Sequence, residues 1–161
     1  MEEANVKELN LDTKVTVKSL AGWDTGFARV VDGIGDVNIT PEGSTRLSRN
    51  EIISQVQTGN RLFSGIDGLG NHATLYINDK ATRIELGFES EDGKIKQEFL
   101  DEEKVKKLFD IKSYDRFESA FVDAVQTRAE KYAVMQIIKR LKLNDYSKIR
   151  FAETHTGFRL E

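Results

Sequence analysis

The sequence predicts an α+β fold in which an N-terminal antiparallel sheet or small barrel precedes a C-terminal helical part. Eleven of the twelve glycines precede residue 100, where they separate short β-branched and aromatic runs. From Leu100 onward glycine is absent until Gly157, and apolar residues recur at helical spacing behind capping residues. We therefore expect a flexible arm over residues 1–12, a β-rich region over 13–99 and a helical region over 100–161, together forming one compact domain.

The first predicted strand covers residues 14–19, where apolar and polar side chains alternate as they do in a half-buried strand. Further strands are expected over residues 27–31, 37–39, 72–77, 81–88 and 94–99 and, in the C-terminal tail, over 148–151 and 157–160. Asn78 and Asp79 stand between the third and fourth of these ranges and predict a hairpin turn.

One helix is expected inside the β-rich region, at about 49–58. Ser48 and Glu51 have the spacing of a capping box, in which each side chain accepts a hydrogen bond from the backbone N–H of the other residue. Gly59 supplies a stop just past the expected end of the helix.

The helical region is divided by capping residues. Asp101 is expected to begin a helix that runs to about residue 110, and Ser113 to begin the next one. Thr127 and Glu130 form another capping-box pattern. The pattern over residues 114–141 therefore predicts either one long helix or two helices, the second of which begins at Thr127.

Composition excludes several classes of protein. The chain of 161 residues contains no cysteine, so disulfides, thiolate catalysis and sulfur-ligated metals are excluded. No run approaches the roughly 18 apolar residues that a membrane span needs. The N-terminal segment is acidic and lacks the pattern of a secretory signal. We therefore expect a protein that is made in the cytoplasm and that does not bind a membrane.

The net charge of −3 is distributed unevenly. Residues 1–125 carry 16 basic and 23 acidic side chains (net −7), whereas residues 126–161 carry 8 basic and 4 acidic ones (net +4). This asymmetry suits head-to-tail packing between copies, or a polyanion site on a basic C-terminal helical face. The candidate polyanion contacts are Arg128, Lys131, Lys139, Arg140, Lys142, Lys148 and Arg150.

No catalytic, metal or cofactor signature stands out. The two histidines, His72 and His155, are too few for a structural zinc site and are expected on the surface or in loops. The turns at Asp32 and Asp36 lack the EF-hand ligand spacing. The glycine-rich segment 65–70 leads into a predicted strand, whereas a dinucleotide-binding loop opens a helix. We expect no cofactor, no metal and no enzymatic activity.

The contact candidates are aromatic. Trp23, the single tryptophan, lies between glycines in a predicted turn, and Phe27 and Tyr132 are the other interface candidates. The segment Trp23-Asp24-Thr25-Gly26-Phe27 and residues 47–63 resemble small virion proteins of tailed bacteriophages, such as head, connector or capsid-associated components. The resemblance covers mainly the N-terminal two-thirds and implies no particular functional residue.

Together, these features predict a non-enzymatic structural or assembly protein. It would act through contacts with itself or with other structural proteins, and the resemblance implies a place in a virion. The alternative prediction is a nucleic-acid-binding protein that uses the basic C-terminal helical face.

Overall fold

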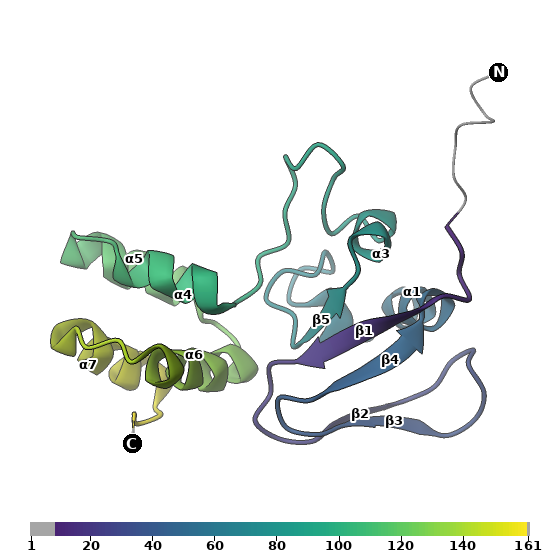
Figure 1. The fold of residues 1–161 in the computed structure, drawn as a ribbon, viewed down its shortest axis with the longest axis horizontal. Helices are drawn as coiled ribbons and strands as arrows, with labels where there is room; N and C mark the ends of the chain where they lie inside the picture. The colour runs from purple at the N-terminus through teal and green to yellow at the C-terminus, as the bar shows by residue number, and fades with distance from the viewer. Residues whose placement is uncertain (1–8, 161) are drawn as a thin grey trace.

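The computed structural model describes residues 9–160, which form a sheet part and a helical part side by side (Figure 1). The strands are β1 (Lys14–Ser19), β2 (Thr25–Ala28), β3 (Asp36–Ile39), β4 (Ser44–Ser48) and β5 (Leu75–Asn78). The helices are α1 (Arg49–Gln57), α2 (Arg61–Ser64), α3 (Lys80–Glu85), α4 (Glu102–Phe109), α5 (Tyr114–Ala124), α6 (Arg128–Leu141) and α7 (Tyr146–Thr156). The predicted α+β class is confirmed.

The sheet part contains a three-stranded antiparallel sheet in the order β4-β1-β5 and a separate antiparallel ribbon of β2 and β3. Val15 lies opposite Leu47, and Val17 lies opposite Ile77. These four side chains share one buried apolar cluster with Phe63 of α2 and with residues of β3 and α1. The alternating pattern of β1 therefore identified both the strand and its buried face correctly.

The predicted hairpin at Asn78-Asp79 is wrong. β5 ends at Asn78, and Asp79 caps α3 by accepting the N–H of Thr82 at 3.1 Å. Asp79 also forms an ion pair with Arg49 of α1, with 3.0 Å between Arg49 Nε and Asp79 Oδ2. A capping carboxylate held by a cation from a distant element thus starts a helix where the local pattern indicated a strand.

The other differences concern short segments. The strand β4 and the helix α2 form where the sequence predicted neither, and β2 begins two residues before its predicted start. Residues 94–99 contact the preceding loop through isolated hydrogen bonds, such as His72 N–H to Glu98 O at 2.8 Å, and form no strand. Residues 148–151 lie inside α7, which Asp145 caps, and residues 157–160 form no strand either.

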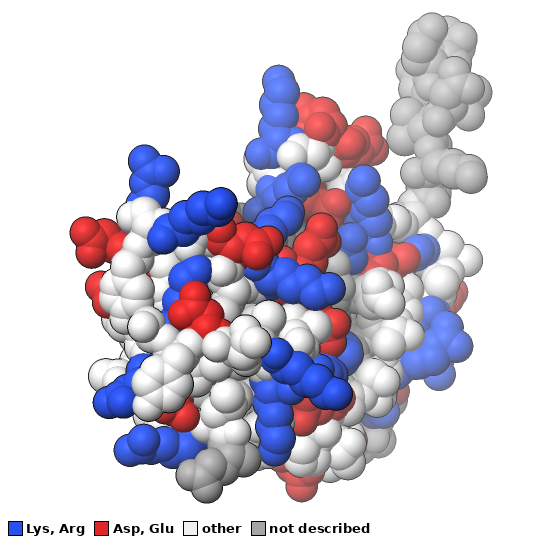
Figure 2. Space-filling view, turned by 60° about the vertical axis from the view of Figure 1, so that its left-hand side comes forward, with Lys and Arg blue, Asp and Glu red and all other residues white. Residues whose placement is uncertain are grey.

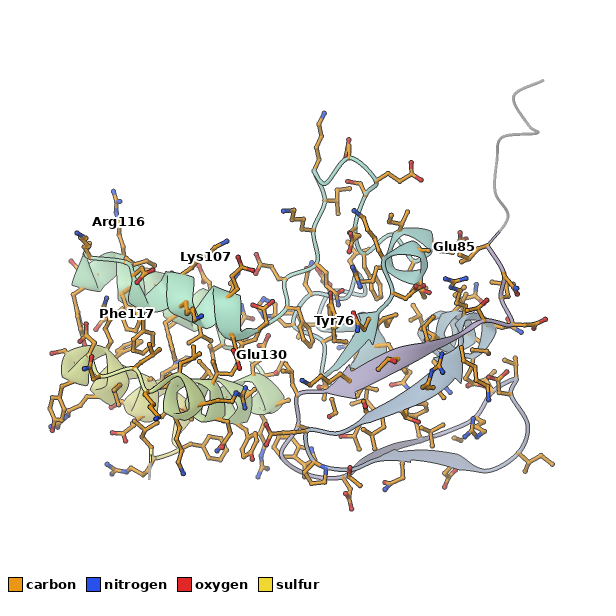
Figure 3. All side chains as sticks on the ribbon, in the orientation of Figure 1. Tyr76, Glu85, Lys107, Arg116, Phe117 and Glu130 are labelled. Atoms are coloured by element: carbon orange, nitrogen blue, oxygen red, sulfur yellow. The ribbon has the colours of Figure 1, made fainter. Side chains whose placement is uncertain are left out.

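The helical part has two layers, with α4 and α5 above α6 and α7 in Figure 1. Phe117 of α5 lies between the layers (Figure 3), with its ring centroid 5.5 Å from that of Phe109 and 5.9 Å from that of Phe151. Residues 114–141 form two helices, because the capping box of Thr127 and Glu130 is present and begins α6. Local capping therefore determined where one helix ends and the next begins.

The buried apolar side chains form two clusters that divide near residue 100, where the sequence changes character. One cluster includes residues of the sheet part up to Phe88, and the other includes residues from Leu100 onward. A polar contact joins the two parts, with 2.9 Å between His72 Nδ1 and Glu130 Oε2, and both residues are buried. Apolar contacts join the two parts as well, since Leu20 of the sheet part packs against the helical cluster.

Most of the predicted arm, residues 1–8, lies outside the described residues. The following residues contact α1, because the N–H groups of Arg49 and Asn50 donate to the carbonyls of Thr13 (3.0 Å) and Leu11 (2.9 Å). The end of the predicted arm is therefore docked on the sheet part.

Candidate functional site

The turn between β2 and β3 carries the most exposed large apolar side chain of the described residues. Ile34 is 100% exposed, and Val30 and Val31 are 43% and 44% exposed. The turn lies at the end of the molecule opposite the helical part (Figure 1). Single exposed apolar residues are ordinary, whereas a group on one short segment indicates a contact surface. We call Val30, Val31 and Ile34 the apolar turn.

The buried side chain of Glu51 on α1 holds the backbone of the apolar turn. Glu51 Oε2 accepts the N–H of Val30 at 2.8 Å, and Oε1 accepts those of Val31 at 2.9 Å and Asp32 at 2.8 Å. Gln55, one helical turn later, donates from Nε2 to Glu51 Oε2 at 2.6 Å and to the last carbonyl of β2 at 2.7 Å. The carboxylate therefore receives four hydrogen bonds.

These hydrogen bonds determine the charge of the Glu51 side chain. Burial raises the pKa of this carboxyl, but the hydrogen bonds from Asp32, Val31, Val30 and Gln55 outweigh burial and lower its pKa below the usual value. Glu51 is therefore ionised at neutral pH, and charge-assisted hydrogen bonds of this kind are stronger than neutral ones.

Further contacts close the turn. The N–H of Arg29 donates to the carbonyl of Gly35 at 2.9 Å, and Asp32 Oδ2 accepts the N–H of Ser48 at 3.3 Å. Gly33 and Gly35 have φ values of 102° and 103°, which side chains rarely tolerate. The turn thus presents its apolar side chains on an ordered backbone.

The capping box predicted at Ser48 and Glu51 is only half formed. Ser48 Oγ accepts the N–H of Glu51 at 3.0 Å, whereas the Glu51 carboxylate contacts the apolar turn and not the Ser48 backbone. The N–H of Ser48 donates to Asp32 Oδ2 and not to the Glu51 carboxylate. Three consecutive turn N–H groups satisfy a buried carboxylate better than one N–H does, and no local pattern reveals such a long-range partner.

The predicted aromatic interface residues mainly contact other parts of the chain. Phe27 is half-buried and packs edge-on against Phe63 of the sheet cluster, with 5.4 Å between ring centroids. Trp23 is 37% exposed and lies 6.2 Å from Tyr132, with the Arg128 guanidinium 5.2 Å from the Trp23 ring centroid. The structure therefore brings Trp23 and Tyr132 together but leaves Phe27 apart. An intermolecular role for these residues stays a prediction.

Tyr132 connects the two parts of the molecule. Its hydroxyl donates to Glu42 Oε2 at 3.2 Å, and its ring centroid lies 6.0 Å from that of Phe158. A Cβ atom at Gly22 would lie 2.3 Å from the Tyr132 ring, so the ring packs directly on the glycine backbone. This close approach explains the glycine that precedes Trp23.

The predicted polyanion contacts do not form one free basic face. Lys148 is buried, and its ammonium group donates to the carbonyls of Phe109 and Ile111 at 2.6 Å each, so this residue is corrected from a surface contact to a structural one. Arg140 forms an ion pair with Glu102 at 2.7 Å.

The other predicted basic residues are spread over the helical part. Arg128 lies over Trp23, and Arg150 donates to the Tyr146 hydroxyl at 3.0 Å. Lys131 is half-buried, whereas Lys139 and Lys142 are exposed. In Figure 2, which brings the helical end forward, basic and acidic side chains are interspersed across the visible face.

Both histidines are structural parts of the fold. His72 lies in a loop, one of the two expected settings, but it is buried, whereas His155 lies in α7 and is half-buried. Glu130 fixes His72 Nδ1, and it also accepts the N–H groups of Gln126 at 2.9 Å and Thr127 at 3.1 Å. His155 lies 2.7 Å through Nε2 from the carbonyl of Val125. Across residues 9–160, no group of three or more acidic or histidine side chains is arranged to hold a metal ion.

A cleft of about 630 Å³ lies between the sheet part and the helical part. Its lining residues are Lys18, Ser19, Leu20, Glu42, Tyr76, Phe99, Leu100, Asp101, Glu102, Glu103, Ala133, Ile137 and Arg140. Three of the four acidic side chains among them have internal roles, since Asp101 caps α4, Glu102 pairs with Arg140 and Glu42 accepts from a tyrosine. The cleft therefore belongs to the junction between the two parts.

Comparison of the chain with protein-family models, curated proteins and solved structures found no match. Among residues 9–160, none of the helices is both long enough and apolar enough for a bilayer span. The geometry of the apolar turn is thus the main observation on which a function can be argued.

Proposed function

We propose that the protein is a non-enzymatic assembly subunit that binds a further copy of itself through the apolar turn. The observation that carries this proposal is the complete exposure of Ile34 on a backbone that Glu51 holds in place. Burying one such aliphatic side chain contributes roughly 1.5–3 kcal/mol. An ordered turn loses little conformational entropy on binding, so more of that contribution remains as affinity.

The distribution of charge supports a second copy as the partner. Residues 1–99 carry 11 basic and 16 acidic side chains (net −5), whereas residues 100–161, which include all four helices of the helical part, carry 13 basic and 11 acidic ones (net +2). The apolar turn and the helical part lie at opposite ends of the molecule (Figure 1). Contact between unlike ends of successive copies brings opposite charges together and generates a ring or filament.

A virion is the setting that we propose for this assembly. The resemblance of residues 23–27 and 47–63 to small virion proteins of tailed bacteriophages supports this setting. The second segment contains Glu51 and Gln55, which hold the apolar turn. Other structural proteins of the same particle are then further partners.

Light scattering over a range of protein concentrations tests the proposal. The wild-type chain of 18.3 kDa should gain mass as concentration rises, and salt should weaken the gain because opposite charges contribute. Ile34→Asp should remain monomeric. Ile95→Asp is the matched control, since Ile95 is 57% exposed on another loop and should assemble as the wild type does.

Two results contradict the proposal. A wild-type chain that stays monomeric at every concentration excludes self-association. Equal loss of assembly in Ile34→Asp and Ile95→Asp excludes a specific role for the apolar turn.

A further inference from the structure

A groove on the helical part lies between α7 and the C-terminal segment 157–160. Its volume is about 590 Å³, and its lining residues are Tyr146, Ile149, Arg150, Glu153, Thr154, Gly157, Arg159 and Leu160. Ile149 and Leu160 are half-buried and pack against the helical cluster, so they form the apolar part of the lining. We call this hollow the α7 groove.

The C-terminal segment that forms one side of the α7 groove is held against the helix. Gly157 ends α7 in the left-handed conformation, with a φ of 77°. The N–H of Leu160 then donates to Glu153 Oε2 at 3.0 Å, and the N–H of Phe158 donates to Thr156 Oγ1 at 3.1 Å. The groove is therefore formed before any partner binds.

Two exposed arginines line the α7 groove. Arg150 donates to the Tyr146 hydroxyl at 3.0 Å, and Tyr146 is 69% exposed. Arg159 forms no ion pair with an acid of residues 9–160, since the one acid of the lining, Glu153, accepts from a backbone N–H. The groove thus combines an apolar lining with an unpaired cation.

The apolar turn has the complementary arrangement. Ile34 is 100% exposed, and Asp36 follows it two residues later. Asp36 is exposed and forms no ion pair with a cation of residues 9–160. An aliphatic side chain beside an unpaired carboxylate matches an apolar lining beside an unpaired guanidinium.

The cations closest to the apolar turn belong to a different surface. Lys14, Arg29 and Arg46 line a hollow together with Asp12 and Asp32, and Asp36 is not among its residues. These cations therefore have acids of their own beside them, which leaves Asp36 for a partner.

We propose that the apolar turn of one copy docks in the α7 groove of the next copy. Ile34 then lies against Ile149 and Leu160. Asp36 pairs with Arg159. This inference rests on the proposed function and identifies the surface that receives the turn.

The contact joins two different copies. The apolar turn and α7 lie at opposite ends of the molecule (Figure 1), so a turn cannot reach the groove of its own chain. Because the two surfaces are unlike, each copy offers one turn and one groove, and assembly continues until a ring closes or a filament grows.

Exchange of the two charges tests the ion pair. Asp36→Arg and Arg159→Asp should each weaken assembly by about three- to tenfold at about 50 mM salt, measured by light scattering, because each places like charges together. Both substitutions in one chain should restore assembly to within about twofold of the wild type, since the pair forms again with its signs exchanged. Asp24→Arg and Arg61→Asp, at exposed positions outside both surfaces, are the matched controls and should assemble normally.

Engineered cysteines test which surfaces meet, since the chain has no cysteine of its own. Val31→Cys places a thiol on the apolar turn and keeps Ile34, and Thr154→Cys places one at the groove. A mixture of these two variants should form disulfide-linked dimers under oxidising conditions, whereas each variant alone should form none. Ser119→Cys, at an exposed position of α5, replaces Thr154→Cys in the control mixture and should form none either.

The outcomes separate the two proposals. Loss of assembly in Ile34→Asp with normal assembly of Arg159→Asp overturns the α7 groove as the receiving surface and leaves the proposed function standing. Disulfides in Val31→Cys alone identify a turn-to-turn contact and overturn the groove too. The same follows if the double charge variant fails to recover while its circular dichroism melt is unchanged, or if the cysteine mixture forms no disulfide. A monomeric wild type overturns both proposals.

Discussion

Glu51 in the sheet part and Lys148 in the helical part are both buried, and the two side chains act on opposite backbone groups. In the sheet part, Glu51 accepts hydrogen bonds from three consecutive N–H groups of the β2–β3 turn. In the helical part, Lys148 donates to the carbonyls of Phe109 and Ile111 at the end of α4. A buried charge thus completes the hydrogen bonding of an irregular segment in both parts.

The segments that these charges hold differ in exposure. Phe109 is buried and Ile111 packs against the helical cluster, so Lys148 serves the core. The segment held by Glu51 presents Ile34, which is 100% exposed. A buried charge therefore stabilises the core in the helical part, whereas in the sheet part it holds an exposed turn in place. Variants of the two charged residues distinguish these roles.

The largest effect is expected from Glu51→Ala. Removing the carboxylate leaves three turn N–H groups without their acceptor and should lower the free energy of unfolding by about 2–4 kcal/mol. Urea denaturation followed by circular dichroism measures the change. Glu85→Ala, at an exposed position labelled in Figure 3, should change the free energy by less than about 0.5 kcal/mol. Equal effects of the two variants would show that water replaces Glu51 without cost.

Lys148→Met should lower the free energy of unfolding by about 1–3 kcal/mol. The apolar part of the side chain is kept, while two carbonyls lose their charged donor. The same denaturation experiment measures the loss, and Lys139→Met at an exposed position is the control. A loss that exceeds that of Glu51→Ala would reverse the ranking of the two buried charges.

Acid should weaken the Glu51 contact. The pKa of folded Glu51 lies below the ordinary value of 4.5, so its contribution is present above pH 4.5 and is lost as pH falls through the folded pKa. Free energies of unfolding measured from pH 6 downward should therefore fall less steeply in Glu51→Gln than in the wild type. Parallel curves for the two proteins would exclude a stabilising charge at this site.

The smallest effect on stability is expected from Ile34→Asp. A fully exposed side chain contributes little to folding, so the free energy of unfolding should change by less than about 0.5 kcal/mol. Thermal melts at low concentration, where the chain is monomeric, measure this. A large destabilisation would assign Ile34 to the fold and remove the basis for a contact surface.

Local signals predicted much of the fold. The alternation in β1, the N-cap Ser48, the N-cap Asp101 and the capping box of Thr127 each act within a few residues, and each element begins where expected. The same local reasoning failed at Asp79, because its ion pair with Arg49 connects segments thirty residues apart.

The candidate site was less accessible to sequence reasoning. Glycines predicted a turn near Asp32, but nothing local indicated that Glu51 would hold its backbone. Lys148 has the local pattern of a surface cation, because the carbonyls that accept from it lie at and just beyond the end of α4, far away in the sequence.

The sequence by itself determined the division into a glycine-punctuated sheet part and a capped helical part, because turns and helix caps depend on neighbours along the chain. Only the tertiary structure decided which charges became buried partners and which side chains stayed exposed. Burial of Glu51 and Lys148 depends on backbone groups 19 to 39 residues away, and such distances become contacts only when the chain folds.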